Sequence, residues 1–108
     1  MSNILTMAMG GVPYGPVNVI SSNANAALPS TIVTNNARNA VRVLITCEDN
    51  PIRYGFGGII PVDSLSGHVL AENDSLVLGH PEAISSFRYI SAIAGAHANL
   101  QITGEYSE

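Results

Sequence analysis

The sequence contains no lysine, and its positive charge rests on four arginines, Arg38, Arg42, Arg53 and Arg88. Charged residues make up 11% of the 108-residue chain, against roughly a quarter in a typical soluble domain. A monomer usually keeps itself soluble with mixed surface charge, so this scarcity favours a protein whose surface is largely covered by partners. An acidic chain with amide-rich loops can also stay soluble unaided, and that alternative remains open.

The net charge of −4 argues against a nucleic-acid partner, because such binding depends on cations that neutralise phosphates. It argues in the same way against an anionic membrane surface. No apolar run approaches the roughly 18 residues of a membrane-spanning helix, and the first residues lack the basic stretch of a secretion signal. We therefore expect a protein that is made in a cytoplasm and kept or assembled there, with neither nucleic acid nor membrane as its partner.

A single cysteine, Cys47, excludes a disulfide framework within the chain and a multi-cysteine metal site. Its position at the end of an apolar run favours a small core residue over a reactive thiol. The histidines, His68, His80 and His97, lie beside glycine or proline turns and lack the paired spacing of a metal-binding barrel. They are interpreted as loop residues rather than ligands, and no metal or other cofactor is expected.

Catalytic motifs are also missing from the sequence. There is no Gly-x-Ser-x-Gly, and the glycines near residue 57 lack the lysine and helix of a phosphate-binding loop. Paired carboxylates for glycoside hydrolysis would have to come from Asp63, Glu72 and Asp74, which lie in predicted turns where acids are usually solvated. We therefore predict that the protein is not an enzyme.

Short β-branched runs alternate with Gly, Pro and Asn along most of the chain, and helical periodicity is nearly absent. About seven or eight such runs, with a turn signal every 8 to 12 residues or so, predict a single-domain, all-β, antiparallel β-sandwich of the jelly-roll or Ig-like kind. Residues 1–16 are rich in Gly, Pro and Met and predict an extended N-terminal arm. Residues 17–108 form the predicted β-sandwich domain.

The stretch 39–58 predicts the central element, a β-hairpin. Residues 39–47 are an apolar run, Asn50-Pro51 signals a turn, and Ile52, Tyr54 and Phe56 share one face of the next run. Further strands are predicted at 17–20, 30–34, 68–71, 75–78, 87–93 and 98–106. In the run 87–93, the residues Phe87, Tyr89 and Ile93 share one face. In the last run, Ala98, Leu100, Ile102 and Tyr106 are expected to point inward, and Asn99, Gln101, Thr103 and Glu105 outward. Residues 81–86 are long enough only for a turn of 3₁₀ helix.

Three arginines, Arg42, Arg53 and Arg88, lie within predicted strands. Planar guanidinium groups suit pairing with carboxylates at an interface, so these residues are predicted to bind a partner. An outward strand face on which they pair with Glu48 or Glu105 across the sheet is the alternative. The sequence leaves both interpretations open.

The aromatic residues divide into two groups. Tyr14 lies in the predicted arm with Val12, and both are predicted to bind a partner, with Tyr14 as the anchor. Most of the others are in phase with apolar neighbours, which favours the core. A sugar-stacking platform would require a solvent-facing Tyr54 or Tyr89.

Residues 40–106 contain, in order, Val41-Arg42-Val43, Pro51-Ile52-Arg53-Tyr54, Gly58 with Pro61, Gly67-His68-Val69-Leu70, Phe87-Arg88-Tyr89-Ile90 and Leu100-Gln101-Ile102. In order and spacing, this segment resembles small β-sandwich structural proteins of tailed bacteriophages. The resemblance implies a non-enzymatic virion protein on the capsid exterior, assembled in the host cytoplasm. It would act as a cement or decoration protein that bridges subunits of the major capsid protein, as a homo-oligomer such as a dimer or trimer. A tail or head–tail junction component and a carbohydrate-binding module remain alternatives.

Overall fold

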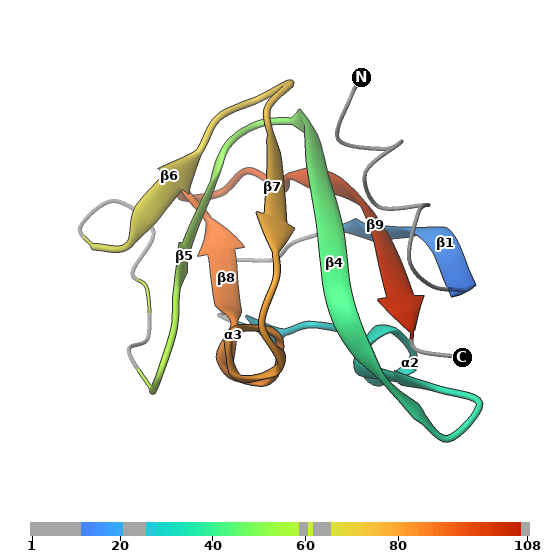
Figure 1. The fold of residues 1–108 in the computed structure, drawn as a ribbon. Coiled ribbons are helices and arrows are strands. Elements are labelled where there is room, and N and C mark those ends of the chain that lie inside the picture. Colours follow the sequence, from blue (N-terminus) through green and yellow to red (C-terminus); the bar gives the residue numbers. More distant parts are fainter. Residues whose placement is uncertain (1–11, 21–25, 59–60, 62–65, 107–108) are drawn as a thin grey trace.

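A computed structural model describes residues 12–20, 26–58, 61 and 66–106. Its strands are β1 (Val12–Ile20), β2 (Ala26–Ala27), β3 (Thr34–Asn35), β4 (Arg38–Asp49), β5 (Ile52–Gly55), β6 (His68–Leu70), β7 (Ser75–Leu78), β8 (Arg88–Ser91) and β9 (Asn99–Tyr106), and its helices are α2 (Ser30–Val33) and α3 (Pro81–Ser86). One sheet has the order β1-β9-β4-β3, with β7 also paired to β4, and the other has the order β2-β8-β5-β6. The two antiparallel sheets enclose one core (Figure 1). The predicted all-β, single-domain sandwich is confirmed.

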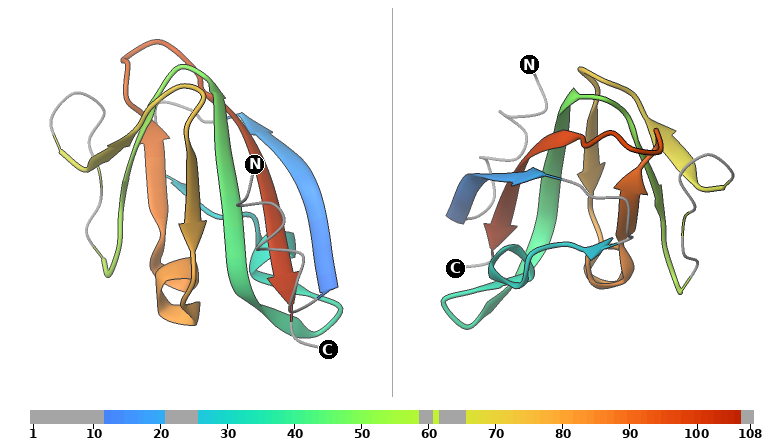
Figure 2. Two further views of the ribbon diagram at one scale, coloured as in Figure 1. Left: turned by 45° about the horizontal axis from the view of Figure 1, so that its top comes forward. Right: turned by 180° about the vertical axis from the view of Figure 1, so that it is seen from behind.

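β4 and β5 lie in different sheets, so the predicted hairpin over residues 39–58 is wrong. β4 pairs with β7 and β9, whereas β5 pairs with β6 and β8. A two-residue hairpin of type I′ needs positive φ at both central positions. Asn50 has a φ of 60°, but the ring of Pro51 holds φ near about −65°. The chain therefore leaves β4 at this turn and enters the facing sheet, as Figure 2 shows.

The predicted strand at residues 30–34 is also wrong, because this segment forms the short helix α2. The carbonyl oxygen of Pro29 accepts hydrogen bonds from the backbone N–H groups of Ile32 and Val33. The turn buries Ile32 completely in the core. Burial of this β-branched residue thus outweighs its preference for extended backbone.

Residues 81–86 form the α-helix α3 rather than a single 3₁₀ turn. Pro81 occupies the first turn, where its missing N–H costs no helical hydrogen bond. Nδ1 of His80 accepts a hydrogen bond from the backbone N–H of Glu82. His80 therefore caps the helix, and Ile84 is buried beneath it.

The strand predicted at residues 87–93 stops at Ser91. Phe87 and Tyr89 are buried as predicted, but Ile93 is 46% exposed and follows the end of β8. The predicted strands at 68–71, 75–78 and 98–106 are confirmed as β6, β7 and β9. Each of the four residues expected to point inward from the last strand is buried: Ala98, Leu100, Ile102 and Tyr106.

Residues 12–16 belong to the sandwich, because β1 pairs with β9 from Val12 opposite Tyr106 to Ile20 opposite Asn99. The boundary predicted at residue 16 therefore falls inside a strand. The rest of the predicted arm, residues 1–11, lies outside the described residues. A bulge between Tyr14 and Val17 shifts the pairing register within β1.

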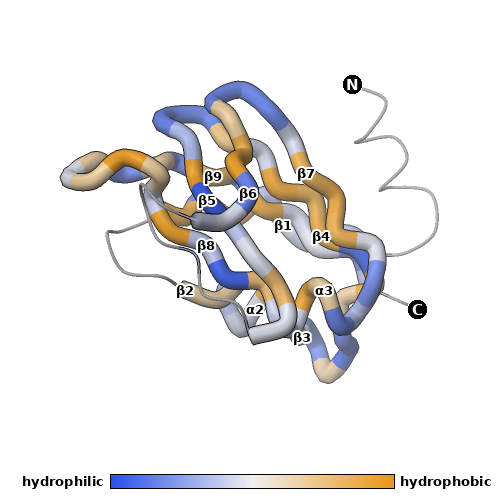
Figure 3. The backbone as a smooth tube through the Cα atoms, turned by 90° about the vertical axis from the view of Figure 1, so that its left-hand side faces the viewer, coloured by the Kyte–Doolittle hydropathy of each residue, from blue (hydrophilic) through white to orange (hydrophobic). Residues whose placement is uncertain are grey.

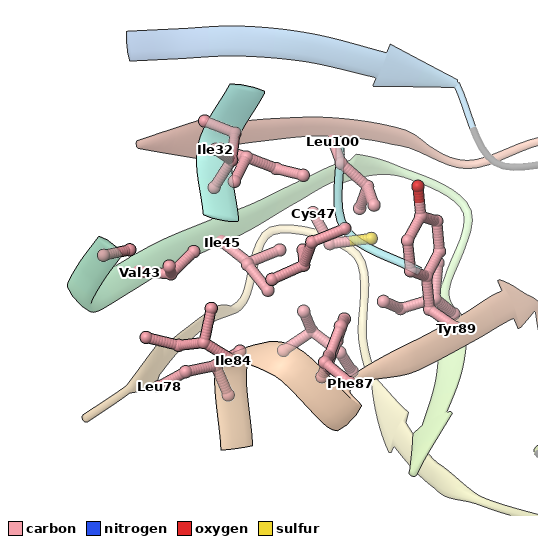
Figure 4. Close-up of a cluster of buried hydrophobic side chains, with 14 of the residues drawn as sticks. Ile32, Val43, Ile45, Cys47, Leu78, Ile84, Phe87, Tyr89 and Leu100 are labelled. Atoms are coloured by element: carbon pink, nitrogen blue, oxygen red, sulfur yellow. The ribbon is translucent and has the colours of Figure 1, made fainter. Parts of the chain in front are cut away.

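The core lies between the sheets and draws on both of them. Ile45 and Cys47 come from β4, Leu100 from β9, and Phe87 and Tyr89 from the segment that enters and forms β8 (Figure 4). The middle of β4 and most of β7 are hydrophobic, whereas the turns at the upper end of the molecule are hydrophilic (Figure 3). The polar and charged residues of β4 thus lie mainly at its two ends.

Candidate protein-binding surface

β1 is an edge strand: it pairs with β9 on one side and with no other described strand. Its apolar side chains reach solvent, with Val12 42%, Tyr14 41% and Ile20 59% exposed. Pro13 and Pro16 lack the N–H groups that an added strand would need. Prolines and bulges on an edge strand hinder the pairing of a further strand with its backbone. A partner would therefore contact the side chains of β1 rather than its backbone.

A hollow of about 140 Å³ lies between the first residues of β1 and the turn that joins β3 to β4. Asn36 and Ala37 form this turn with φ values of 52° and 61°, the positive pair that a type I′ hairpin requires. The residues that line the hollow are Val12, Pro13, Tyr14, Asn35, Asn36, Arg38 and Tyr106. Two residues predicted to bind a partner, Val12 and Tyr14, therefore share one surface.

The three arginines predicted to bind a partner do not lie on this surface. Nε of Arg42 lies 2.7 Å from Oε1 of Glu105, so Arg42 does pair with this acid across the sheet. Glu105 is fully buried, however, so its predicted outward position is wrong. Nη1 of Arg53 donates a hydrogen bond of 3.0 Å to the carbonyl oxygen of Gly67. Arg88 is half-buried on β8. Binding of a partner by these three residues stays a prediction.

Arg38 was not among the arginines predicted to bind a partner, but it lines the hollow beside Tyr14. Within the described ranges its side chain makes neither a hydrogen bond nor an ion pair, unlike the side chains of Arg42 and Arg53. It is exposed at the first position of β4, opposite Asn35. The sequence alone could not single out Arg38, because the fold decides which acidic side chains lie close to each arginine.

The opposite end of β4 is acidic. Asp49 ends the strand, and Glu72 and Asp74 lie in the turn between β6 and β7. The backbone N–H of Cys47 donates to the carbonyl oxygen of Asp74 at 2.9 Å, which holds the turn against β4. Burial, together with the carboxylates of Glu72, Asp49 and Asp74, raises the pKa of the Cys47 thiol to about 11. Cys47 is thus a buried, protonated core residue at neutral pH.

Asn50 joins three turns at this acidic end. Its backbone N–H donates to Oε1 of Glu72, and its Nδ2 donates to the carbonyl oxygen of His97, both at 3.1 Å. The positive φ of Asn50 is a conformation that asparagine adopts more readily than most residues. The acidic end is therefore a fixed arrangement of turns.

Aromatic rings gather at one edge of the second sheet, with neighbouring ring centroids between 5.5 and 5.9 Å apart. Of the two candidate sugar-stacking residues, Tyr89 is buried in the core, whereas Tyr54 is half-buried. Tyr54 lines a hollow of about 480 Å³ with Gly55, Phe56, Gly67 and His68. This hollow is a second candidate surface.

Potential metal ligands do not gather on either surface. Among the described residues, no group of three or more His, Cys, Asp or Glu side chains is arranged to hold a metal ion. His80 caps α3 and His68 packs against Tyr54, so both have a structural explanation. In the same part of the chain, no helix is both long and apolar enough to cross a membrane.

Comparisons of the chain with known protein families, with characterised proteins and with solved structures find no match. Among the described residues, three of the six exposed large hydrophobic side chains lie on β1: Val12, Tyr14 and Ile20. Aromatic anchors of this kind are enriched at protein–protein interfaces.

Proposed function

We propose that the chain is a non-enzymatic structural protein of a phage virion. It acts as a capsid cement or decoration protein, which stabilises the head by bridging subunits of the major capsid protein. The observation that carries the proposal is the blunted edge strand β1, on which Val12 and Tyr14 are exposed. The choice of a phage capsid as partner is supported by the sequence resemblance.

The physical mechanism is multivalent contact. Tyr14 brings a large apolar ring with a polar hydroxyl group, a combination that anchors well in a partner's pocket. One such contact is weak, but linked copies on a repeating shell bind with a high effective concentration. Sparse charge fits this role, because a surface that becomes covered needs few ionised groups.

Point substitutions on β1 test the proposal better than removal of residues 1–16, since residues 12–16 are part of the sheet. The full chain is mixed with capsid shells of the virus that encodes it, and the bound fraction is measured after sedimentation. We expect a variant with Val12→Ser and Tyr14→Ser to bind at least about tenfold more weakly, a loss of about 1.4 kcal/mol.

A matched control changes two exposed valines elsewhere, Val69→Ser and Val77→Ser, on β6 and β7. This variant should bind shells as the unchanged protein does. Equal binding by the β1 variant and the unchanged chain would refute the proposed surface. Electron microscopy of the particles separates a shell protein from the alternative, a tail or head–tail junction component, by its position.

A carbohydrate-binding role is the second candidate, and the hollow beside Tyr54 is the observation that favours it. Aromatic faces pack against the apolar faces of sugar rings, and His68 adds a polar group. A glycan array tests this role. Binding that disappears in Tyr54→Ala would support it, and an array without any binding would remove it.

A further inference from the structure

We propose that copies of this chain associate head to tail, with the acidic end of one copy against the Arg38 end of the next. The Arg38 end is the β3–β4 turn with Asn35, Asn36 and Arg38. The acidic end comprises Asp49 and Asp74. This contact between copies is independent of the proposed capsid partner.

The two ends cannot neutralise each other within one molecule. β4 has 12 residues and runs from Arg38 to Asp49, so its ends are roughly 36 Å apart at about 3.3 Å per residue. Charges in physiological salt are screened beyond about 8 Å. Figure 1 shows the β3–β4 turn and the β4–β5 turn at opposite ends of the molecule. A charge pair between these ends therefore requires a second copy.

Among the residues that the structure describes, each end has exposed charge without an ion-pair or hydrogen-bond partner. Arg38 makes no side-chain hydrogen bond or ion pair in the described part of the chain, and neither do the carboxylates of Asp49 and Asp74. These three residues are all exposed. Guanidinium and carboxylate groups form short, bidentate, charge-assisted hydrogen bonds, so the ends are chemically complementary.

Apolar side chains beside the acids supply area for the same contact. Ile20 is 59% exposed on β1. It lies opposite Asn99 of β9, which in turn lies opposite Asp49 of β4. Ile93 is exposed in the loop after β8, next to the turn at Asn50. The acidic end thus combines charge with apolar surface, as interfaces between proteins do.

The charge pattern limits the symmetry of the contact. A two-fold contact through one end alone would place Arg38 against Arg38, or acids against acids. Contact between opposite ends is compatible with a ring or an open chain, and also with an antiparallel two-fold dimer in which the Arg38 end of each copy meets the acidic end of the other. Arg38 and Tyr14 line the same hollow, so the next copy would lie directly beside the surface proposed for a shell.

The molar mass of the full chain, measured by light scattering over a range of concentrations, tests this inference. We expect the mass to rise with concentration at low salt and to fall toward that of a monomer at about 0.5 M salt, where screening is strong. Arg38→Glu should weaken association at least tenfold, and so should Asp49→Lys combined with Asp74→Lys. A matched control, Glu82→Lys on α3, should associate as the unchanged chain does.

Mixing the two charge-reversed proteins is the decisive arm of the experiment. Each alone carries like charges at both ends. Wherever the two proteins alternate, as in a dimer, an even-numbered ring or an open chain, opposite charges meet at each contact, so association should return. Thermal unfolding of each variant confirms that these exposed substitutions leave the fold intact; Arg38→Gln replaces Arg38→Glu if it does not. A chain that stays monomeric at millimolar concentration overturns the inference, as does association that neither variant weakens.

Discussion

Nε of Arg42 lies 2.7 Å from Oε1 of Glu105, across the pair that joins β4 to β9. The Glu105 side chain is fully buried, whereas that of Arg42 is 34% exposed. The pair sits directly beside the bulge between Ala40 and Arg42, where the register of the two strands shifts. A buried carboxylate needs a cation nearby, so this contact favours the observed register over a slipped one.

Arg42→Met should therefore destabilise the protein, since it removes the guanidinium group that faces the buried carboxylate of Glu105. Breaking a fully buried pair costs about 3–5 kcal/mol, and the partial exposure of Arg42 lowers the expected cost to about 2 kcal/mol. Urea unfolding of the variant and of the unchanged chain measures this loss in the free energy of unfolding. The double variant Arg42→Met with Glu105→Leu should recover most of the loss. A single variant that unfolds at the same urea concentration as the unchanged chain would contradict this role.

The sequence predicted those strands whose pattern is local. β9 alternates apolar and polar residues along most of its length, β7 is a short, mostly apolar run between turn signals, and both were placed correctly. The hairpin over residues 39–58 failed because pairing depends on which strands compete for β4, and β7 and β9 occupy its sides. A local turn signal predicts where the chain turns, but it does not predict which sheet the next strand joins.

The candidate surface was predicted only in part. Tyr14 and Val12 were identified from their position in a Gly- and Pro-rich segment, and both are exposed. Arg38 was missed, and Arg42 was chosen, because the sequence does not say which arginine lies opposite an acid. That choice depends on register: Arg42 falls opposite Glu105, whereas Arg38 falls opposite Asn35.

Cys47 should make stability depend on pH in the alkaline range. Its pKa rises from 9.0 to about 11 in the fold, so its contribution is fully present below pH 9 and is lost as the pH rises toward 11. The free energy of unfolding is measured from pH 7 to 11 for the unchanged chain and for Cys47→Ala. The difference in the free energy of unfolding between the two proteins should stay constant up to pH 9 and then become smaller. A constant difference up to pH 11 would show that burial does not perturb the thiol.

Tyr106→Phe should destabilise the link between β9 and α2. The hydroxyl group of Tyr106 donates a hydrogen bond to the carbonyl oxygen of Ile32, and both residues are buried. Without that donor the carbonyl group stays buried and unsatisfied, which costs about 1–2 kcal/mol. Thermal or urea unfolding measures the change. Tyr14→Phe is the matched control, because Tyr14 is exposed and its substitution should alter stability by less than about 0.5 kcal/mol.

Asn50 should stabilise the protein in two ways, through the hydrogen bond of its side chain and through its tolerance of a positive φ. Two substitutions separate these contributions to the free energy of unfolding. Asn50→Gly keeps the positive φ but loses the hydrogen bond from Nδ2 to His97, so it should cost about 1 kcal/mol. Asn50→Ala loses the same bond and places a Cβ in the left-handed region, which adds about 1 kcal/mol. The order of stability in urea unfolding should be Asn, then Gly, then Ala. If Ala proves as stable as Gly, the backbone conformation at residue 50 contributes nothing to the acidic end. Equal stability of all three would mean that the turns there are held by contacts that every variant keeps, among them the backbone N–H of residue 50 with Glu72 and the backbone contacts of Cys47.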